Sequence, residues 1–206
     1  MDRIVYGPTL IYRENRLTRR TRRAVDFVLA TVLLLFAIPV MAVACLAIFL
    51  EDGGPVVFSQ RRAGRFERMF TIFKLRTMKR ELCFDRPSPT NDGDVRITAV
   101  GRVIRKASID ELPQLFNVMF GHMSLIGPRP EMAIIMRGYQ NWQHLRHLVA
   151  PGITCIWQTT CRKTIPRDRP EATALDIDYI RRASPLLDGE LLLRTIATVV
   201  FPKGAF

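Results

Sequence analysis

Residues Phe27–Leu50 read FVLATVLLLFAIPVMAVACLAIFL and contain no charged side chain, and only Thr31 is polar. As a straight α-helix this stretch would be about 36 Å long, which exceeds the roughly 30 Å of a bilayer's hydrocarbon core. A chain of 206 residues has enough length for one domain and little room to surround such a helix. The stretch therefore predicts a segment that enters a membrane, in preference to a buried core helix.

Basic residues flank this segment on both sides. Before it lie Arg13, Arg16, Arg19, Arg20, Arg22 and Arg23, and after it lie Arg61, Arg62, Arg65, Arg68, Lys74, Arg76, Lys79 and Arg80. Positive residues stay cytoplasmic, so a single crossing would put one of these clusters outside. Pro39, in the middle, lacks a backbone donor and should kink the helix. We therefore predict a helix–break–helix hairpin that returns to the same side, with a kinked transmembrane helix as the alternative.

The whole chain carries 31 basic and 19 acidic side chains, a net charge of +12, and 48% of its residues are apolar. The apolar content excludes wholesale disorder. The charge indicates a polyanionic partner, which could be nucleic acid, anionic lipid or a phosphate-bearing substrate. The four cysteines form no Cys-x-x-Cys pair and follow no evident signal peptide, which favours reduced thiols in a cytosolic setting.

Residues 51–206 predict a small, mostly helical α/β domain. Residues 56–60 and 69–78 predict two short strands joined by a basic loop, and 81–94 predicts a mobile loop. Apolar residues at helical spacing predict helices over about 100–107 and 112–119, with Gly121 at the end of the second. Further helices are expected at 131–148, 172–182 and 188–201. The last one is amphipathic, and its apolar side could face either the membrane surface or the core.

Arg105–Gln114 reads RKASIDELPQ and contains an acidic pair. Proline is accepted in the first turn of a helix, so Pro113 places Asp110 and Glu111 near a helix N-terminus, where the dipole favours charged carboxylates. An ionised aspartate can act as a nucleophile, and a neighbouring glutamate can hold Mg²⁺. Arg105 and Lys106 would supply positive charge for a pyrophosphate. Ordinary helix capping is the more common reason for an acidic pair near a helix start, so the spacing alone does not establish a catalytic site.

A second polar motif is Gly127-Pro128-Arg129-Pro130. Prolines on both sides restrict the backbone around a single arginine. A stiff loop that presents a guanidinium suits bidentate phosphate binding. A rigid turn with a solvated arginine is the alternative reading, and the motif by itself does not separate the two.

Taken in order, these motifs resemble the monotopic polyprenyl-phosphate phosphoglycosyl transferases, also called bacterial sugar transferases. The likeness runs from about Arg22 to Arg162, and the ending Lys203-Gly204-Ala205 also fits. The stretches that carry it are RRAVD (22–26), QRRAG (60–64), KLRTM (74–78), SIDELPQLFNV (108–118), MSLIGPRP (123–130) and PGIT (151–154).

The resemblance implies a reaction and a role for particular residues. Asp110 would attack the phosphate bonded to the sugar of a nucleotide-diphosphate sugar and release the nucleoside monophosphate. A polyprenyl phosphate would then attack the covalent phosphosugar–aspartate. Glu111 would bind Mg²⁺, and Arg105, Arg129 and Arg76 would bind the substrate phosphates and the nucleotide. A uridine nucleotide and an undecaprenyl acceptor, in the first membrane step of exopolysaccharide or other glycoconjugate synthesis, are the family's expectation.

The resemblance also implies a layout. A basic segment (1–23) would precede a re-entrant hairpin (24–50) that breaks at Pro39. A catalytic domain (51–206) would then lie on the cytoplasmic face of a bacterial inner membrane, in contact with its lipids. Other members carry additional N-terminal membrane helices, so this chain resembles the minimal form.

The sequence departs from the family pattern at His122, where an acidic or polar residue is more usual, at Leu75, where phenylalanine is common, and at Cys155 and Cys161, which replace glycines. The cysteines put any transfer of substrate preference in doubt. Two other functions stay open: a membrane-bound module that binds polyanions, and an inactive scaffold for glycan assembly. We expect no nucleic-acid partner. The sequence leaves open which sugar is carried and whether the chain forms a homo-oligomer.

Overall fold

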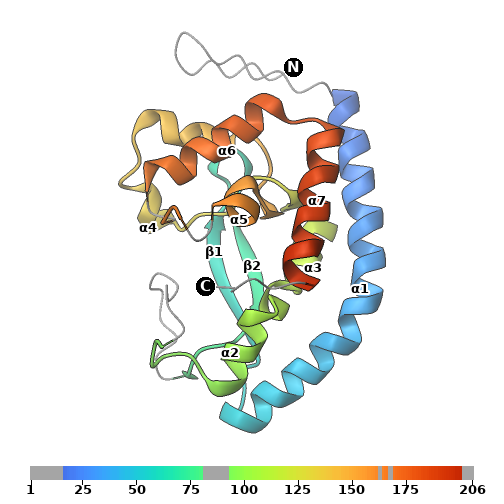
Figure 1. Ribbon diagram of the computed structural model, residues 1–206, viewed down its shortest axis with the longest axis vertical. Coiled ribbons are helices and arrows are strands. Elements are labelled where there is room, and N and C mark those ends of the chain that lie inside the picture. Colours follow the sequence, from blue (N-terminus) through green and yellow to red (C-terminus); the bar gives the residue numbers. More distant parts are fainter. Residues whose placement is uncertain (1–15, 81–92, 162–163, 167–168, 201–206) are drawn as a thin grey trace.

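Helix α1 (Arg16–Asp52) is the longest element of the computed structural model and runs along one whole side of it (Figure 1). The structure describes residues 16–80, 93–161, 164–166 and 169–200. The loop expected at 81–94 therefore falls mostly outside the described residues, as does the motif Lys203–Ala205. By length and composition α1 could cross a membrane, which agrees with the prediction of a membrane segment.

One narrow stripe of α1 packs against the rest of the protein. Its buried residues are Asp26, Ala30, Leu34, Ala37, Met41, Ala44 and Ile48. They recur every three or four positions, which is the spacing of one helix face. Away from this stripe the surface is apolar and exposed: Leu35 is 67% exposed, Phe36 72% and Val43 71%. Because the buried stripe continues from Asp26 to Ile48, α1 lies against the domain along most of its length.

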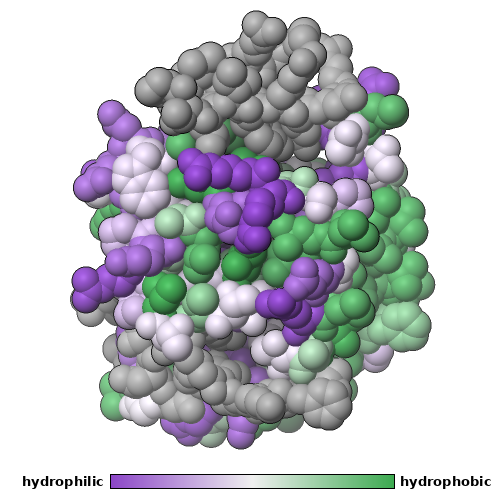
Figure 2. All heavy atoms as spheres, turned by 45° about the horizontal axis from the view of Figure 1, so that its top comes forward, coloured by the Kyte–Doolittle hydropathy of each residue, from purple (hydrophilic) through white to green (hydrophobic). Residues whose placement is uncertain are grey.

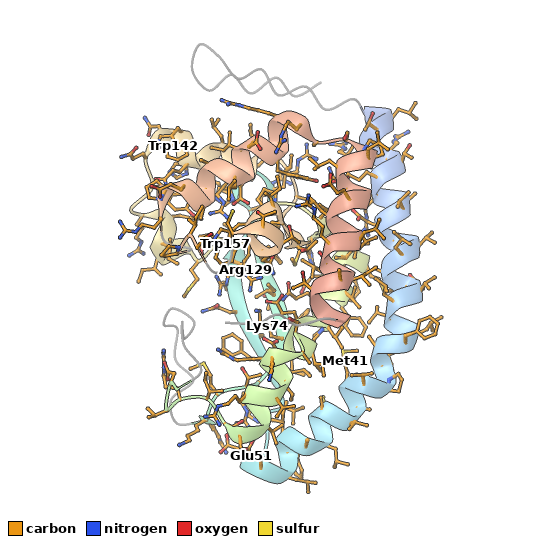
Figure 3. The ribbon with its side chains drawn as sticks, viewed as in Figure 1. Met41, Glu51, Lys74, Arg129, Trp142 and Trp157 are labelled. Atoms are coloured by element: carbon orange, nitrogen blue, oxygen red, sulfur yellow. The ribbon has the colours of Figure 1, made fainter. Side chains whose placement is uncertain are left out.

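The predicted break at Pro39 is a bend within a helix that stays continuous. Pro39 lies inside α1, and the helix changes direction near Met41, which Figure 3 labels. Below this bend α1 turns toward α2 (Ala99–Lys106), and Ala44 and Ile48 pack with Ile104 of that helix. A proline without a backbone donor accounts for the change of direction.

An antiparallel hairpin occupies the centre of the molecule (Figure 1). Strands β1 (Val57–Ala63) and β2 (Met69–Leu75) pair so that Gln60 faces Ile72, and a single 3₁₀ turn (Arg65–Glu67) joins them. Both strands were expected from the sequence. The structure adds a short parallel pair, β3 (Ser124–Ile126) and β4 (Gly152–Thr154), which the sequence did not predict.

Helices surround the hairpin. They are α2, a 3₁₀ turn (Ile109–Glu111), α3 (Gln114–Met119), α4 (Ala133–Met136), a 3₁₀ helix (Asn141–Leu148), α5 (Ile156–Thr160), α6 (Pro170–Arg182) and α7 (Pro185–Val200). In Figure 1, α6 crosses near the top, α7 runs beside α1, and α2 lies near the bottom. The helices expected over 100–107, 112–119 and 172–182 are thereby confirmed, with small shifts at their ends.

The single helix predicted over 131–148 is wrong. The structure has the short helix α4 and a separate 3₁₀ helix, with Gly138 between them. Gln140 starts the second helix through a reciprocal cap, in which its backbone N–H donates to Oε1 of Gln143 at 2.8 Å. This local cap ends one helix and begins another, although the apolar spacing runs through both.

The last helix, α7, begins at Pro185, three residues before its predicted start at 188. The hydroxyl of Ser184 accepts from the backbone N–H of Leu187 at 3.2 Å, and this cap fixes the start. Leu191 is buried in the main core with Leu34 of α1, whereas Leu186 and Leu193 are exposed by 87% and 69%. Helix α7 therefore packs on the core with one face and presents apolar side chains with another.

Candidate active site

The acidic pair lies in the tight connection between α2 and α3. Helix α2 starts at Thr98, whose hydroxyl accepts from the N–H of Gly101 at 2.9 Å, and its last residues are Arg105 and Lys106. Ser108 then adopts a left-handed conformation with φ of +56°, which non-glycine residues rarely do. This reversal folds the 3₁₀ turn containing Asp110 and Glu111 back toward Arg105. The pair was expected at a helix N-terminus, and the structure places it in the turn just before α3.

Asn117 fixes this turn against the hairpin. Its side chain is fully buried; its amide nitrogen donates to the Thr71 carbonyl at 2.7 Å, and its oxygen accepts from the N–H of Phe73 at 3.1 Å. A buried amide with both ends satisfied holds two elements in one register. These two hydrogen bonds therefore fix the position of α3 along β2. The acidic turn that precedes α3 lies over the end of that strand.

Two cations hold the carboxylate of Glu111. Nζ of Lys74, on β2, lies 2.8 Å from Oε1, and Nη2 of Arg129 lies 2.5 Å from the same oxygen. Figure 3 shows Lys74 and Arg129 close together at the centre of the molecule. Burial alone would raise the pKa of Glu111, but the charges and hydrogen bonds of Arg129 and Lys74 outweigh burial and hold that pKa well below its ordinary value. Glu111 is therefore a carboxylate at neutral pH.

Asp110 has a different environment from its neighbour. It is half-buried, and no hydrogen bond or ion pair to its carboxylate occurs within the described parts of the chain. Burial and the negative charge of Glu111 raise its pKa, while Lys74, Arg105 and Arg129 act in the opposite direction. Burial thus acts against the charged form that the helix dipole was expected to favour, and that expectation stays a prediction. Asp110 is the unengaged carboxylate, held beside three cations.

Arg105 is held by one of its guanidinium nitrogens. Its Nε donates to Oγ1 of Thr77 at 2.7 Å, which fixes the direction of the side chain. The described residues provide no partner for its two terminal nitrogens. Burial lowers the pKa of Arg105, and Asp110 and Asp94 oppose that effect, so the guanidinium remains charged. A planar group with two free nitrogens next to Asp110 suits a phosphate.

A buried hydrogen-bond network fixes the backbone and the side chain of Arg129. Nη2 of Arg146 donates to the Arg129 carbonyl at 2.9 Å and pairs with Asp176 at 2.5 Å. With the amide of Gln158 turned so that its oxygen faces Arg129, that oxygen accepts from Nη1 at 2.8 Å. The loop between Pro128 and Pro130 therefore presents Arg129 to Glu111 in a fixed direction. A solvated arginine in a simple turn, the alternative left open by the sequence, does not describe this residue.

Arg76 does not join the cluster. It is 4% exposed, and its Nη2 donates to the carbonyls of Asp52 and Gly53 at 3.1 and 2.5 Å. Its Nη1 also pairs with the carboxylate of Asp52 at 3.2 Å. Cations at a helix C-terminus satisfy the last carbonyls and oppose the dipole. The structure thus ties Arg76 to the end of α1, and we leave it out of the phosphate-binding set.

Sequence reasoning missed Lys74 and Gln158 as members of the cluster. Lys74 stands in an otherwise apolar stretch, MFTIFKL, and a lone lysine in a half-buried strand was the available signal. Burial lowers its pKa and the charge of Glu111 opposes that shift. Cys155, one of the departures from the family pattern, is buried, and burial raises the pKa of its thiol to about 12. That thiol stays protonated at neutral pH.

The donor set fits Mg²⁺, the metal that the family resemblance implies. Both short contacts of Glu111 use Oε1, whereas the described residues give Oε2 only Nη1 of Arg129, at 3.5 Å. A carboxylate oxygen with free lone pairs can bind a hard cation. Mg²⁺ usually takes one or two carboxylates and fills its other positions with substrate phosphates and water. Oε2 of Glu111 could supply one such carboxylate oxygen.

A family model described as "Bacterial sugar transferase" matches residues 17–202. The chain belongs to this family. The match confirms the resemblance and covers α1, the hairpin and the acidic turn as one unit. The cluster around Asp110 and Glu111 lies within the matched residues.

Several curated relatives that match this chain are named as sugar phosphotransferases or sugar-1-phosphate transferases. The undecaprenyl-phosphate glucose phosphotransferase of Komagataeibacter xylinus is 40% identical over 90% of this chain and 37% of its own length. An N-acetylgalactosaminephosphotransferase of Aeromonas hydrophila that uses undecaprenyl phosphate is 37% identical over 89% of this chain and 44% of its own length. A UDP-glucose:undecaprenyl-phosphate glucose-1-phosphate transferase of Caulobacter vibrioides is 38% identical over 90% of this chain and 72% of its own length. The chain thus spans less than half the length of the first two.

Proposed function

We propose that this sugar transferase moves a sugar-1-phosphate from a UDP-sugar to undecaprenyl phosphate, with Asp110 as the nucleophile. The observation that carries the proposal is the contrast within the acidic pair. Two cations hold Glu111, whereas Asp110 has no hydrogen-bond partner in the described chain and faces positive charge. A free carboxylate surrounded by cations can attack a phosphate, because the cations bind the phosphate oxygens and offset its negative charge.

The first step forms a bond between a carboxylate oxygen of Asp110 and the phosphorus next to the sugar. The bond from that phosphorus to the bridging oxygen breaks, and its electron pair leaves with uridine monophosphate. In the second step an oxygen of undecaprenyl phosphate attacks the same phosphorus, and the Asp110 carboxylate is released unchanged. Both attacking oxygens belong to anions, so neither step needs a proton to be removed from the nucleophile.

The residues around Asp110 would bind the substrate phosphates, the nucleotide and the metal. Arg105 offers two free nitrogens beside Asp110 and would bind the transferred phosphate. Arg129, fixed by Glu111 and Gln158, would contact the nucleotide diphosphate. Lys74 keeps Glu111 ionised and adds positive charge close to the reacting phosphorus. Glu111 would hold Mg²⁺, which would neutralise charge on the diphosphate when bound.

We infer that α1 enters the cytoplasmic leaflet of a bacterial inner membrane and returns to the same side. The buried stripe supports this, because a helix packed along the domain from Asp26 to Ile48 cannot stand across a bilayer while the domain stays in water. The basic residues on both flanks and the bend at Pro39 support it as well. Figure 2 shows hydrophobic surface along the right-hand side, where α1 lies, and exposed Leu186 and Leu193 of α7 extend the apolar surface.

The test is release of uridine monophosphate by protein held in nanodiscs with undecaprenyl phosphate and Mg²⁺. The names of the relatives mention glucose, galactose and N-acetylgalactosamine, so the UDP forms of these three sugars come first in the donor panel. We expect release with one donor, dependence on Mg²⁺, and loss in Asp110→Asn. Full release in Asp110→Asn would exclude the proposed nucleophile. No release with any donor, from folded protein, would favour an inactive scaffold.

A further inference from the structure

The N-terminal half of α1 lines a cavity of about 560 Å³ that is separate from the acidic turn. This pocket lies between α1 and the segment from the end of α3 to β3, and it is lined chiefly by Arg19, Arg20, Arg23, Phe27, His122 and Met123. A volume in this range is typical of pockets for small ligands. Asp110, Glu111, Lys74, Arg105 and Arg129 are not among the residues that line it. The reaction proposed above gives this pocket no role.

Most of the positive charge in the pocket is uncompensated. Arg19 and Arg20 are exposed, and no residue of the described chain bonds to either guanidinium. Arg23 donates to the carbonyls of Val118 and Met119, which are neutral groups, so its charge remains. Those two bonds cap the C-terminus of α3 and fix the guanidinium at the pocket wall. Gly121, with φ of +82°, turns the chain beside it, and a Cβ there would meet Arg23 at 3.4 Å.

One carboxylate also lines the pocket, but it is engaged elsewhere. Oδ1 of Asp26 accepts from the backbone N–H of Leu125 at 3.1 Å, and the residue is 8% exposed. Arg22, which does have a carboxylate partner, pairs with Asp188 at 3.2 Å. The net charge of the lining is therefore strongly positive, because five arginines line it together with a single acidic residue.

His122 adds a hydrogen-bond donor to the pocket. It is one of the positions at which the sequence departs from the family pattern, and the reaction assigns it no role. Its ring stacks on Phe70 at 5.9 Å and meets Phe120 edge-on at 6.3 Å. An imidazole carries at least one N–H at any pH, and an additional positive charge when protonated. A histidine in place of an acidic residue favours an anion here.

The pocket lies where the protein surface changes from basic to apolar. Arg19 and Arg20 come about two turns before Phe27, which begins the uncharged stretch of α1 and is itself 46% exposed. Phe27 and Met123 supply apolar walls next to the arginines. Lipid phosphates lie at this boundary of a membrane, and anionic lipids attract basic residues beside a membrane helix. A ligand with a phosphate and an acyl chain would match both parts of the pocket.

We propose that this pocket binds the phosphate group of an anionic membrane phospholipid. Arg19 and Arg20 contact the phosphate from the solvent side, Arg23 and His122 contact it from the protein side, and the first carbons of the acyl chain lie against Phe27. The bound lipid joins α1 to α3 and holds the start of the membrane segment at the level of the headgroups.

The test uses the full chain in a neutral maltoside detergent and follows its unfolding temperature as short-chain lipid is added. A ligand that binds the folded state raises this temperature in a concentration-dependent way. We expect dihexanoyl phosphatidylglycerol to raise it and dihexanoyl phosphatidylcholine to have little effect. The double variant Arg19→Gln/Arg20→Gln should weaken the apparent affinity for phosphatidylglycerol at least tenfold. The matched control Arg137→Gln/Arg181→Gln removes the same charge from exposed sites outside the pocket and should bind like the unmodified protein.

Three results would overturn the proposal. Equal stabilisation by both lipids would show that the acyl chains act without recognition of the headgroup. Equal affinity for glycerol phosphate without acyl chains would assign the pocket to a soluble phosphate ester. Equal loss in the two double variants would reduce the effect to overall charge. The unfolding temperature without lipid reports whether each variant is folded, and none of these readings depends on sugar transfer.

Discussion

Nζ of Lys74 lies 2.8 Å from Oε1 of Glu111, and this ion pair joins the end of the β-hairpin to the turn that carries the proposed nucleophile. Both side chains are largely buried, with exposures of 18% and 16%. The pair thus has two consequences: it keeps Glu111 ionised, and it fixes the acidic turn on β2.

Lys74→Gln should impair both stability and turnover. Removing one partner of a largely buried charge pair leaves Glu111 with Arg129 alone, and the cost should be about 2 kcal/mol. Because the pKa of Glu111 is depressed in the folded state, the pair contributes stability at neutral pH that is lost as the pH falls through that pKa. The difference in unfolding free energy between the two proteins should therefore shrink in acid. A constant difference from neutral pH down to about pH 3 would contradict this.

The pH dependence of turnover should report the ionisation of the Asp110 carboxylate. Its pKa is raised by burial, and a nucleophile must be ionised, so kcat/KM should fall with decreasing pH at a value above that of an ordinary aspartate. Single-turnover release of uridine monophosphate between pH 4 and pH 8 measures this limb. A raised acid pKa also means that burial disfavours the charged form, so Asp110→Asn should be more stable than the unmodified protein at neutral pH. A less stable Asp110→Asn protein would argue against this burial effect.

Arg105→Gln and Arg76→Gln should have opposite effects. Arg105 has free donors beside Asp110, so its loss should lower kcat/KM on the order of 100-fold and change the unfolding temperature little. Arg76 caps α1 and is buried, so its loss should cost about 2–3 kcal/mol of stability. Its remaining folded fraction should show nearly normal KM. Similar KM defects in both variants would return Arg76 to the phosphate-binding set.

Gly152 should tolerate no side chain. A Cβ there would meet the backbone nitrogen of Gly127 at 2.1 Å, because β4 and the end of β3 approach closely at this point. Gly152→Ala should therefore destabilise the protein by about 3 kcal/mol or more. Gly138→Ala is the control, since its nearest contact would be an ordinary 3.6 Å and the expected change is within about 1 kcal/mol. Chemical denaturation of the two variants measures the difference.

Pro39→Ala should alter the course of α1. Alanine restores the backbone donor and is about 3 kcal/mol more favourable than proline inside a helix, so the straight form becomes accessible. If the segment is re-entrant, part of the protein should then cross the membrane, with its N-terminus on the outer side. Protease cleavage of an N-terminal tag in spheroplasts detects this, with Ile38→Ala as the matched control. Protection identical to the control would show that packing along α1 alone holds its path.

Several elements could be read from the sequence because local chemistry specifies them. The uncharged stretch predicted a membrane segment interrupted or kinked at Pro39, and the structure has a continuous helix with a bend there; both strands of the hairpin were also predicted. The helix 131–148 failed because the reciprocal cap between Gln140 and Gln143 interrupts an apolar spacing that otherwise continues. The parallel pair β3–β4 was not predicted because each strand has only three residues and pairs with residues 28 positions away, such as Ser124 with Gly152.

By itself, the sequence determined the family to which the chain belongs and that one segment is suited to a membrane. Charge-free length and the order of the motifs are properties of the chain, and they hold without a fold. Only the tertiary structure decided which partners the polar side chains of the motifs have. It engaged Glu111 with Lys74 and Arg129, left Asp110 without a hydrogen-bond partner among the described residues, and turned Arg76 toward the end of α1. Side-chain partners of this kind depend on burial and on distances between elements far apart in sequence, because both electrostatic interactions and pKa values are set in space.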